Sequence, residues 1–278
     1  MQATSQASGL EDLEIELLLE GIYRHYGYDF RDYALSSVRR RVRTCVQAEK
    51  VPTISGLKEK ILHDRNCLER FLLTLSINVT AMFRDPSFYH AFRTTVVPIL
   101  RTYPFIRIWH AGCSTGEEVY SMAILMMEEG MYERCRIYAT DMNDSVLRRA
   151  RDGVFPLSTM KQYTENYIRA GGSRAFSDYY STNVDSSIFS SSLKKNMVFA
   201  QHNLAIDGPF NEFHVIFCRN VMIYFNKQLQ ERVHHLFLES LIRRGFLGLG
   251  SKESLKQTPH ESWYEPFNAQ NRIYRRAR

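Results

Sequence analysis

A short glycine loop beside two acidic residues is the first feature of this sequence that could bind a ligand. The run Ala111-Gly112-Cys113-Ser114-Thr115-Gly116 follows an apolar stretch and precedes Glu117-Glu118. Glycine lets the backbone pass close to a ligand, because no Cβ occupies the space. The run lacks the third glycine of the dinucleotide fingerprint GxGxxG, and the acidic pair would repel a pyrophosphate. A ligand with a cationic methionine group would not meet that repulsion.

Asp141 is the second feature of the sequence that could bind a ligand, because of its distance from the glycine loop. It ends a strand-like run 25 residues after Gly116, and an acidic residue at about 20 residues commonly meets ribose hydroxyls. Asp141 is therefore a candidate ribose ligand. A simpler interpretation stays open for both features, because loop glycines often only form turns and an Asp after a strand often only caps the next helix.

The elements around these residues predict a Rossmann-like α/β fold. Strand, glycine loop and helix in that order open a nucleotide-binding βαβ unit, and a second strand-helix pair follows. This alternation favours a parallel sheet with helices on both faces. We expect strands at 108–111, 136–140, 197–200, 215–218, 246–249 and 272–275, and helices at 117–129, 143–151 and 228–243.

The N-terminal region and one internal segment differ from this pattern. Apolar residues at helical spacing, such as Ile15, Leu18, Leu19 and Ile22, predict amphipathic helices before residue 100. The segment 152–196 is rich in Ser, Tyr, Asn and Gly, and its turn signals indicate an inserted subdomain.

Composition and charge restrict the class of protein. Of 278 residues, 44% are hydrophobic, yet no apolar stretch approaches the roughly 18 residues that cross a bilayer. Five scattered cysteines never form a CxxC pair, so we expect no disulfide framework, no metal site and a cytoplasmic location. A net charge of +6 suits a nucleic acid or an acidic protein surface equally well.

Three segments stand out by their order and spacing. They are Asn78-Val79-Thr80-Ala81-Met82-Phe83-Arg84-Asp85-Pro86, then residues 111–121 beginning with Ala111-Gly112, then Phe217-Cys218-Arg219-Asn220-Val221-Met222-Ile223-Tyr224-Phe225. Together they resemble the CheR family of chemotaxis receptor methyltransferases. The resemblance spans nearly the whole chain. It implies a helical N-terminal domain with its linker at 10–85, a Rossmann-like methyltransferase domain at 86–278, and a small β-subdomain inserted in it at 152–196.

The same resemblance implies the chemistry. The cofactor would be S-adenosyl-L-methionine, with S-adenosyl-L-homocysteine as product, and the activity would be glutamate methyl ester formation on the cytoplasmic methylation helices of a chemoreceptor. The implied catalytic residues are Arg84, Arg219 and Tyr224. The implied cofactor-binding residues are Asn78, Thr80, Arg84, Ala111, Gly112, Glu117, Asp141, Met142, Asn203, Leu204, Arg219 and Asn220.

Three positions depart from the family. Met82 stands where Phe is usual, Val119 stands where Pro is common, and Gly171-Gly172-Ser173-Arg174 only loosely resembles the glycine-bearing hairpin of the family's subdomain. In some members that hairpin docks on a receptor C-terminal peptide. Whether the insert of this chain tethers a receptor therefore stays open.

The choice of glutamate as methyl acceptor determines which catalytic groups the site needs. Its carboxylate is ionised near pH 7 and needs no general base, so we expect a site poor in His and Cys that orients the reactants. Arg84 can grip a carboxylate with its planar fork, and Tyr224 can donate a hydrogen bond or offer its ring to the sulfonium. The alternative is that Arg84 pairs with Asp85 or a surface acid and that Tyr224 belongs to the core.

A basic helix near the N-terminus indicates how the chain could contact its partner. The basic helix with Arg39, Arg40, Arg41 and Arg43 is the expected receptor contact, although a solvated helix face is the simpler alternative. We expect a monomer without membrane insertion and without a nucleic-acid partner. Competing functions are a methyltransferase for nucleic acid or a small molecule, a non-catalytic cofactor-binding signalling module and, more distantly, an NAD-dependent dehydrogenase.

Overall fold

The computed structural model describes residues 2–75 and 80–277, and the chain divides into two compact units. The helical unit comprises residues 1–78, 203–207 and 224–232. The Rossmann unit comprises residues 79–202, 208–223 and 233–278. The two segments 203–207 and 224–232 thus leave the Rossmann unit to join the helices.

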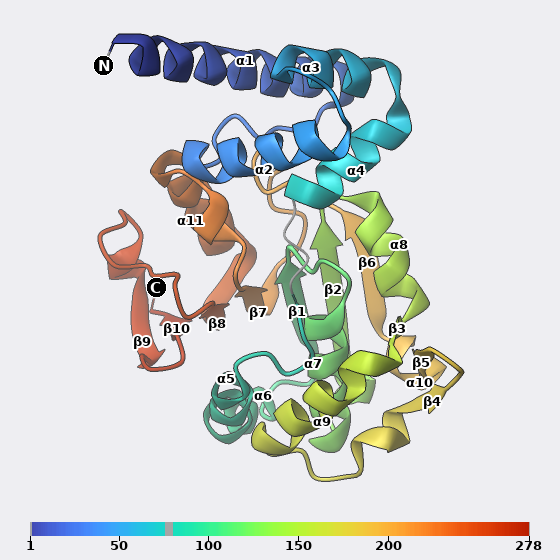
Figure 1. Ribbon diagram of the computed structural model, residues 1–278. Helices are drawn as coiled ribbons and strands as arrows, with labels where there is room; N and C mark the ends of the chain where they lie inside the picture. The colour runs from blue at the N-terminus through green and yellow to red at the C-terminus, as the bar shows by residue number, and fades with distance from the viewer. Residues whose placement is uncertain (1, 76–79, 278) are drawn as a thin grey trace. The chain divides into compact units, whose positions relative to one another are not determined.

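The helical unit is built from four helices, which Figure 1 shows in blue to cyan. They are α1 (Gln2–Tyr26), α2 (Leu35–Ala48), α3 (Ile54–His63) and α4 (Arg65–Leu75). The apolar stripe of α1 is buried, as its helical spacing requires. The Thr53 side chain caps α3 by accepting a hydrogen bond from the Gly56 N–H at 3.0 Å.

The Rossmann unit contains a seven-stranded sheet in the order β6-β2-β1-β7-β8-β10-β9 (Figure 1). The strands β6, β2, β1, β7 and β8 run parallel, whereas β10 is antiparallel to both β8 and β9. Parallel strands end at one edge of a sheet, so the loops after β1, β2, β6 and β7 begin at that edge. Their bounds are β1 (Ile106–Ala111), β2 (Cys135–Asp141), β6 (Met197–Gln201), β7 (Phe213–Cys218), β8 (Leu241–Leu249), β9 (Tyr264–Asn268) and β10 (Ile273–Arg276).

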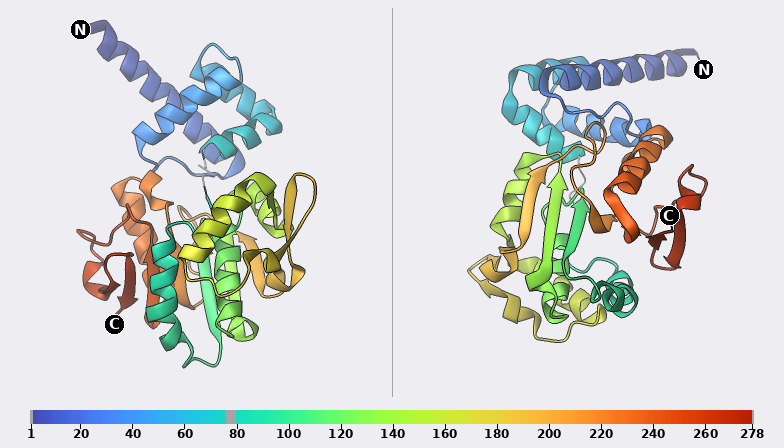
Figure 2. Two further views of the ribbon diagram at one scale, coloured as in Figure 1. Left: turned by 60° about the horizontal axis from the view of Figure 1, so that its bottom comes forward. Right: turned by 180° about the vertical axis from the view of Figure 1, so that it is seen from behind.

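Helices lie beside this sheet, as both views in Figure 2 show. Every residue of α7 from Val119 to Met126 is buried, which explains why this run is apolar apart from Ser121. The helices are α5 (Pro86–Ala91), continued by a π-helical turn (Phe92–Val96) into α6 (Val97–Leu100), then α7 (Glu117–Glu128), α8 (Asp144–Asp152), α9 (Met160–Arg169), α10 (Ser191–Lys194) and α11 (Lys227–Ser240).

A second, three-stranded antiparallel sheet lies in the segment where an insert was expected. It has the order β3-β5-β4, with β3 (Val154–Pro156), β4 (Tyr180–Thr182) and β5 (Ser186–Phe189). The buried Glu128 carboxylate of α7 accepts hydrogen bonds from the Tyr167 and Tyr179 hydroxyls and from the Ser173 N–H. The Gly171-Gly172-Ser173 turn is thereby anchored to α7.

The predicted fold class is confirmed, with three differences in detail. The helix expected at 228–243 is wrong at its end: it stops at Ser240, because Leu241 enters the sheet and pairs with Phe213 of β7. Strand β9 and helix α9 were not expected at all. Strand pairing explains the end of α11 and strand β9. Helix α9 instead follows a helical pattern, because its buried residues Met160, Tyr163 and Tyr167 lie on one face.

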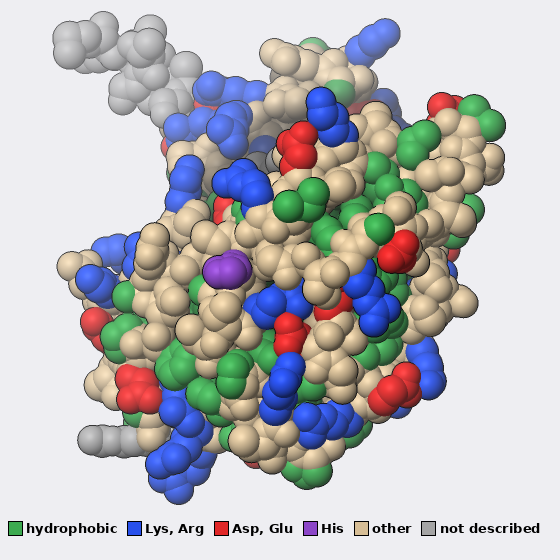
Figure 3. All heavy atoms as spheres, turned by 90° about the horizontal axis from the view of Figure 1, so that it is seen from below, with side chains coloured by type: hydrophobic (Ala, Val, Ile, Leu, Met, Phe, Trp, Pro, Cys, Tyr) green, Lys and Arg blue, Asp and Glu red, His purple; other side chains and the backbone are tan. Residues whose placement is uncertain are grey.

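In the face shown in Figure 3, Lys and Arg side chains are spread among Asp and Glu side chains. Within the described ranges, no helix has both the length and the apolar character needed to cross a membrane. All five cysteines are free and buried.

Candidate functional site

The glycine loop between β1 and α7 is tightly folded. Gly112, Ser114 and Gly116 have φ angles of +74°, +51° and +95°, in the left-handed region that favours glycine. The N–H groups of Gly112 and Cys113 both donate to the Thr140 carbonyl of β2, at 2.8 and 2.9 Å. The loop is thereby fixed to the neighbouring strand.

Asp141 joins the same arrangement from the end of β2. Its Oδ2 accepts a hydrogen bond from the Ser114 N–H at 2.9 Å, and its Oδ1 accepts one from the Asn143 N–H at 3.0 Å. The α8 cap is Asn143, whose side chain accepts from the Ser145 N–H, so the simpler interpretation of Asp141 as the helix cap is not supported. The Met142 N–H also acts on this carboxylate, and with three N–H donors on two oxygens Asp141 keeps one lone pair for a ligand hydroxyl.

Glu117 is a second buried carboxylate at this edge of the sheet. It is the first residue of α7, and its Oε2 accepts a hydrogen bond from the Thr115 hydroxyl at 2.7 Å. Burial raises the pKa of Glu117 and that of Asp141 above their usual values. Neither carboxylate forms an ion pair with any described residue. Two buried acids of this kind fit a ligand with hydroxyl groups and a positive charge.

The segment that carries Arg84 is pinned on both sides of that residue. Phe83 and Asp85 have φ angles of +50° and +56°, conformations that cost energy and persist only where the surroundings hold them. The Phe83 N–H donates to the Ser121 hydroxyl of α7 at 2.8 Å. The Arg84 carbonyl accepts a hydrogen bond from Arg219 Nη2 at 3.2 Å. The backbone that presents Arg84 is therefore rigidly placed in the Rossmann unit.

Arg219 is the buried centre of an ion-pair network. Its side chain is only 2% exposed and bonds Asp85 Oδ2 at 2.9 Å and Glu118 Oε2 at 2.8 Å. The guanidinium also lies over the Phe88 ring, 4.0 Å from its centroid. Burial alone would raise the pKa of Glu118, but the hydrogen bond from His110 and the charge of Arg219 hold it below its usual value. Asp85 thus pairs with Arg219.

Glu253 organises the loop after β7 and was missed by sequence reasoning. Its carboxylate accepts hydrogen bonds from the N–H groups of Asn220, Val221 and Met222 at 3.0, 2.9 and 2.8 Å, and from Gly250 at 2.6 Å. Burial nevertheless raises its pKa. Asn220 adopts a left-handed φ of +62° in this loop. A single Glu after the fifth parallel strand has no local sequence signal that distinguishes it.

Two further cofactor candidates, Ala111 and Met142, lie at or just after the ends of β1 and β2. Ala111 is the buried last residue of β1, and the Met142 carbonyl accepts a hydrogen bond from Gln201 Nε2 at 2.9 Å. Thr80 is half-buried. Asn78 lies outside the described residues. The cofactor roles of all four remain predictions.

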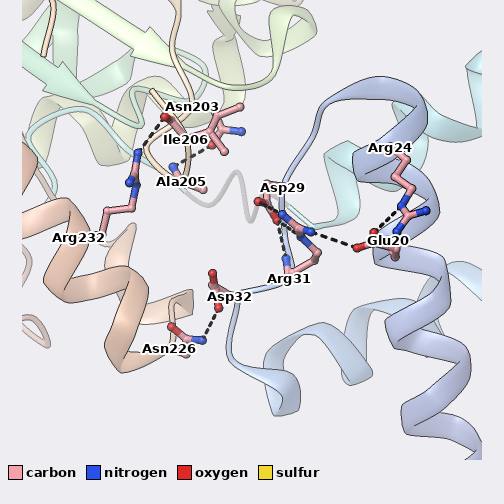
Figure 4. A network of polar contacts seen from close by, with 10 residues as sticks. All are labelled: Glu20, Arg24, Asp29, Arg31, Asp32, Asn203, Ala205, Ile206, Asn226 and Arg232. Carbon is pink, nitrogen blue, oxygen red and sulfur yellow. Dashed lines mark hydrogen bonds and ion pairs between the residues drawn. The ribbon is translucent and has the colours of Figure 1, made fainter. Parts of the chain in front are cut away.

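Three further candidates, Asn203, Leu204 and Tyr224, belong to the helical unit. The Asn203 N–H donates to Asp207 and its Oδ1 accepts from the Ala205 N–H, which closes a tight turn. Figure 4 shows this turn with Arg232, which donates to the Ile206 carbonyl, and shows Asn226 pointing toward Asp32. Leu204 is buried. The pairing of Arg84 and Tyr224 at one reaction centre therefore stays a prediction.

Tyr224 is held within the helical unit through its backbone and its ring. Its carbonyl accepts a hydrogen bond from the Ala34 N–H at 2.8 Å. The Arg41 guanidinium lies over its ring, 4.4 Å from the centroid. Tyr33 and Phe225 form an isolated antiparallel bridge next to it. Tyr224 is thus fixed against α2.

The basic helix α2 does not present its four arginines alike. Arg41 is buried, which corrects the expectation that it lies on an exposed receptor-binding surface. Arg39 pairs with Asp12 and Glu11 of α1, and Arg43 binds both oxygens of Glu11. Arg40 is exposed. Much of the positive charge of α2 is therefore neutralised by α1.

The expectation of a site poor in His and Cys stays a prediction, although one histidine and two cysteines lie beside the candidate residues. His110 contacts Glu118, Cys113 lies in the glycine loop, and Cys218 ends β7. Burial raises the pKa of both thiols well above the usual value, so both sulfurs stay protonated at neutral pH. In this state the two thiols are poor nucleophiles.

Comparison with known families decides which kind of site this is. A model described as "CheR methyltransferase, SAM binding domain" matches residues 78–273, and one described as "CheR methyltransferase, all-alpha domain" matches residues 13–76. The chain belongs to the CheR methyltransferase family. The predicted family is confirmed, and with it S-adenosyl-L-methionine as the cofactor.

Individual CheR relatives agree over most of their length. The chain is 49% identical to the "Putative methyltransferase Cher3" of Pseudomonas putida, over 96% of this chain and 97% of that protein. It is 32% identical to "Chemotaxis protein methyltransferase 2" of Pseudomonas aeruginosa, over 89% of this chain and 88% of that protein. The Salmonella typhimurium "Chemotaxis protein methyltransferase" is 29% identical over 92% of this chain and 89% of its own length.

Proposed function

We propose that this CheR protein transfers a methyl group from S-adenosyl-L-methionine to glutamate side chains on the cytoplasmic methylation helices of a chemoreceptor-type signalling protein. The observation that carries the proposal is the pinned Arg84 segment. The backbone of this segment is held by two left-handed residues and by contacts to Ser121 and Arg219, which supports a role for the Arg84 side chain in aligning a carboxylate. The names of the chemotaxis relatives support a receptor as the partner.

The residues of the chain divide the work of binding and orientation. Asp141 would accept a hydrogen bond from a ribose hydroxyl, and Glu117 would lie near the methionine portion, where a buried negative charge favours a cationic ligand. When bound, the cofactor supplies a methyl group on a positively charged sulfur, which an ionised carboxylate oxygen can take directly. Alignment of two reactants in this way can lower a barrier by about 7 to 11 kcal/mol.

Arg219 and Arg84 differ in the roles we assign to them. Arg84 would touch the acceptor carboxylate, whereas Arg219 is occupied by Glu118, Asp85 and the Arg84 carbonyl. Arg219 is therefore a positioning residue that acts through the Arg84 segment. An arginine on the acceptor also lowers its charge density, so its gain in alignment must exceed that loss.

Tyr224 would contribute through its hydroxyl. The Arg41 guanidinium already covers one face of its ring, which makes that face unavailable to a sulfonium. The hydroxyl can donate a hydrogen bond to an acceptor oxygen. Arg40, the exposed arginine of α2, remains a candidate for contact with an acidic receptor surface.

The test is transfer of tritiated methyl groups from S-adenosyl-L-methionine to purified receptor cytoplasmic fragments, followed by mild base. Carboxyl methyl esters release volatile methanol, whereas N-methyl groups survive. We expect base-labile label that requires the methylation-site glutamates. Arg84→Ala should lower turnover by more than tenfold with a smaller effect on cofactor affinity, and Arg84→Lys should retain less than full activity because it lacks the fork. Base-stable label, or label on RNA alone, would refute the proposal.

A further inference from the structure

Helix α9 of the inserted segment contacts the backbone just before Arg84. The Asn166 side chain donates from Nδ2 to the Met82 carbonyl at 3.0 Å, although the two residues lie 84 positions apart in the sequence. Met82 and the next residue, Phe83, are fully buried. The insert therefore supports the segment that presents Arg84.

The next residue of α9, Tyr167, holds the same segment through its ring. The ring lies edge-on to that of Phe83, with 5.3 Å between the centroids. The Tyr167 hydroxyl donates to the Glu128 carboxylate of α7 and accepts from the Arg174 N–H at 2.9 Å. A Cβ at Gly172 would lie 2.2 Å from Tyr167 Cζ, which explains why the turn after α9 carries a glycine there. Helix α9 is thereby held firmly against the segment.

Two hydrogen bonds from different helices clamp one peptide group. The Met82 carbonyl and the Phe83 N–H belong to the same peptide. Asn166 of α9 donates to its oxygen, and the Ser121 hydroxyl of α7 accepts from its nitrogen at 2.8 Å. Relaxation of Phe83 from its left-handed φ of +50° would rotate this peptide plane and break both bonds. The clamp therefore maintains the strained turn directly before Arg84.

We infer that Asn166 is a positioning residue for methyl transfer, which holds Arg84 in place for the acceptor carboxylate. The inference rests on the proposed function, since Asn166 acts through the role assigned to Arg84. A misplacement of about 1 Å can cost on the order of 100-fold in rate. Loss of the Asn166 amide should therefore lower kcat. Asp141 and Glu117 keep their own hydrogen bonds in such a variant, so cofactor affinity should not change.

The experiment compares Asn166→Ala with Asn196→Ala in the full chain. Asn196 is the matched control, because its Nδ2 also donates to a backbone carbonyl, that of Tyr132 at 2.7 Å, and both asparagines are half-buried. With saturating S-adenosyl-L-methionine and a receptor fragment that wild type methylates, Asn166→Ala should lower kcat at least tenfold. Its affinity for S-adenosyl-L-homocysteine, measured by calorimetry, should stay within twofold of wild type. Asn196→Ala should leave both quantities within twofold of wild type.

A double-mutant cycle shows whether Asn166 acts through Arg84. In the Arg84→Ala background, Asn166→Ala should lower kcat by less than a further twofold, because the side chain that it positions is absent. An equal loss of kcat in both backgrounds would overturn the inference. A wild-type kcat for Asn166→Ala would overturn it as well.

The outcomes separate this inference from the proposed function. If wild type methylates no receptor fragment, the proposed function fails and the inference falls with it. If wild type methylates the fragment, the inference stands or falls on the two kcat measurements alone. Should Asn166→Ala melt well below Asn196→Ala, Asn166→Asp decides, since it keeps the shape of the side chain without the amide donor. A tenfold loss of kcat that depends on Arg84 supports the inference, and any smaller or independent loss overturns it.

Discussion

Arg219 donates through Nη1 to Glu118 Oε2 at 2.8 Å, and this contact joins the loop after β7 to the first turn of α7. The other end of the same guanidinium holds Asp85 and the Arg84 carbonyl. One side chain thus connects all three sequence motifs that identify the CheR family.

Removal of Arg219 should therefore destabilise the Rossmann unit as well as impair transfer. Arg219→Ala breaks a pair in which Arg219 is 2% and Glu118 is 20% exposed, so we expect a loss near the lower end of the buried-pair range, about 3 kcal/mol. Urea denaturation at pH 7 measures this loss. Arg148→Ala, which breaks an exposed pair with Asp144, is the matched control and should change the free energy of unfolding by less than about 0.5 kcal/mol. Equal effects of the two variants would contradict a buried network.

The pH dependence of the free energy of unfolding should reveal the contribution of the ionised Glu118 side chain. Its pKa is held below 4.5 in the folded protein, so its ionised form contributes stability that is complete above about pH 4.5 and is lost as the pH falls through the folded value. The free energy of unfolding of wild type minus that of Glu118→Gln should be positive at pH 7 and should shrink toward zero on acidification. A difference that stays constant from pH 7 to pH 3 would show that the charge of Glu118 is not involved.

Gly112 should tolerate no side chain. A Cβ at this position would lie 2.6 Å from Val221 Cγ2, and its φ of +74° already disfavours alanine. Gly112→Ala should lower both the melting temperature and the affinity for S-adenosyl-L-homocysteine. Gly130→Ala has a similar φ of +67° with no atom within 4 Å, so it should show only the conformational cost of about 1 to 2 kcal/mol. Val221→Ala should partly rescue Gly112→Ala if the clash, and not the backbone alone, is responsible.

Asp141→Asn should weaken cofactor binding by more than tenfold. The asparagine must turn an NH2 group toward either the Ser114 or the Asn143 N–H, and it loses the charge that strengthens a bond to a ribose hydroxyl. Calorimetry with S-adenosyl-L-homocysteine measures the change. Asp144→Asn, an exposed acid on the first turn of α8, should bind as wild type does. Wild-type affinity in Asp141→Asn would remove Asp141 from the cofactor site.

Much of the fold could be predicted from local patterns, because buried parallel strands read as short apolar runs. The strand expected at 136–140 is β2 (Cys135–Asp141), and the strand at 215–218 lies within β7 (Phe213–Cys218). The end of α11 could not be predicted in this way, because Leu241 continues a helical pattern and only its partner Phe213 on a distant strand draws it into the sheet.

Some site residues could likewise be predicted from local sequence, whereas others depend on contacts with distant parts of the chain. The glycine loop and Asp141 are recognisable from spacing alone, whereas the partner of Asp85 is Arg219, 134 residues away, and Glu253 acts through backbone groups that carry no sequence signal. Arg41 is a different case. Its spacing from Val38 and Cys45 already places it on the apolar face of α2, so a closer use of helical periodicity would have separated it from the exposed arginines.

The four N–H groups gathered by Glu253 have a consequence for how the loop after β7 meets a ligand. A loop that is already closed around an internal anion has given up its conformational freedom when the chain folds, so little entropy remains to be lost on ligand capture. Binding of a ligand to this preorganised loop should therefore be fast and should need little backbone rearrangement.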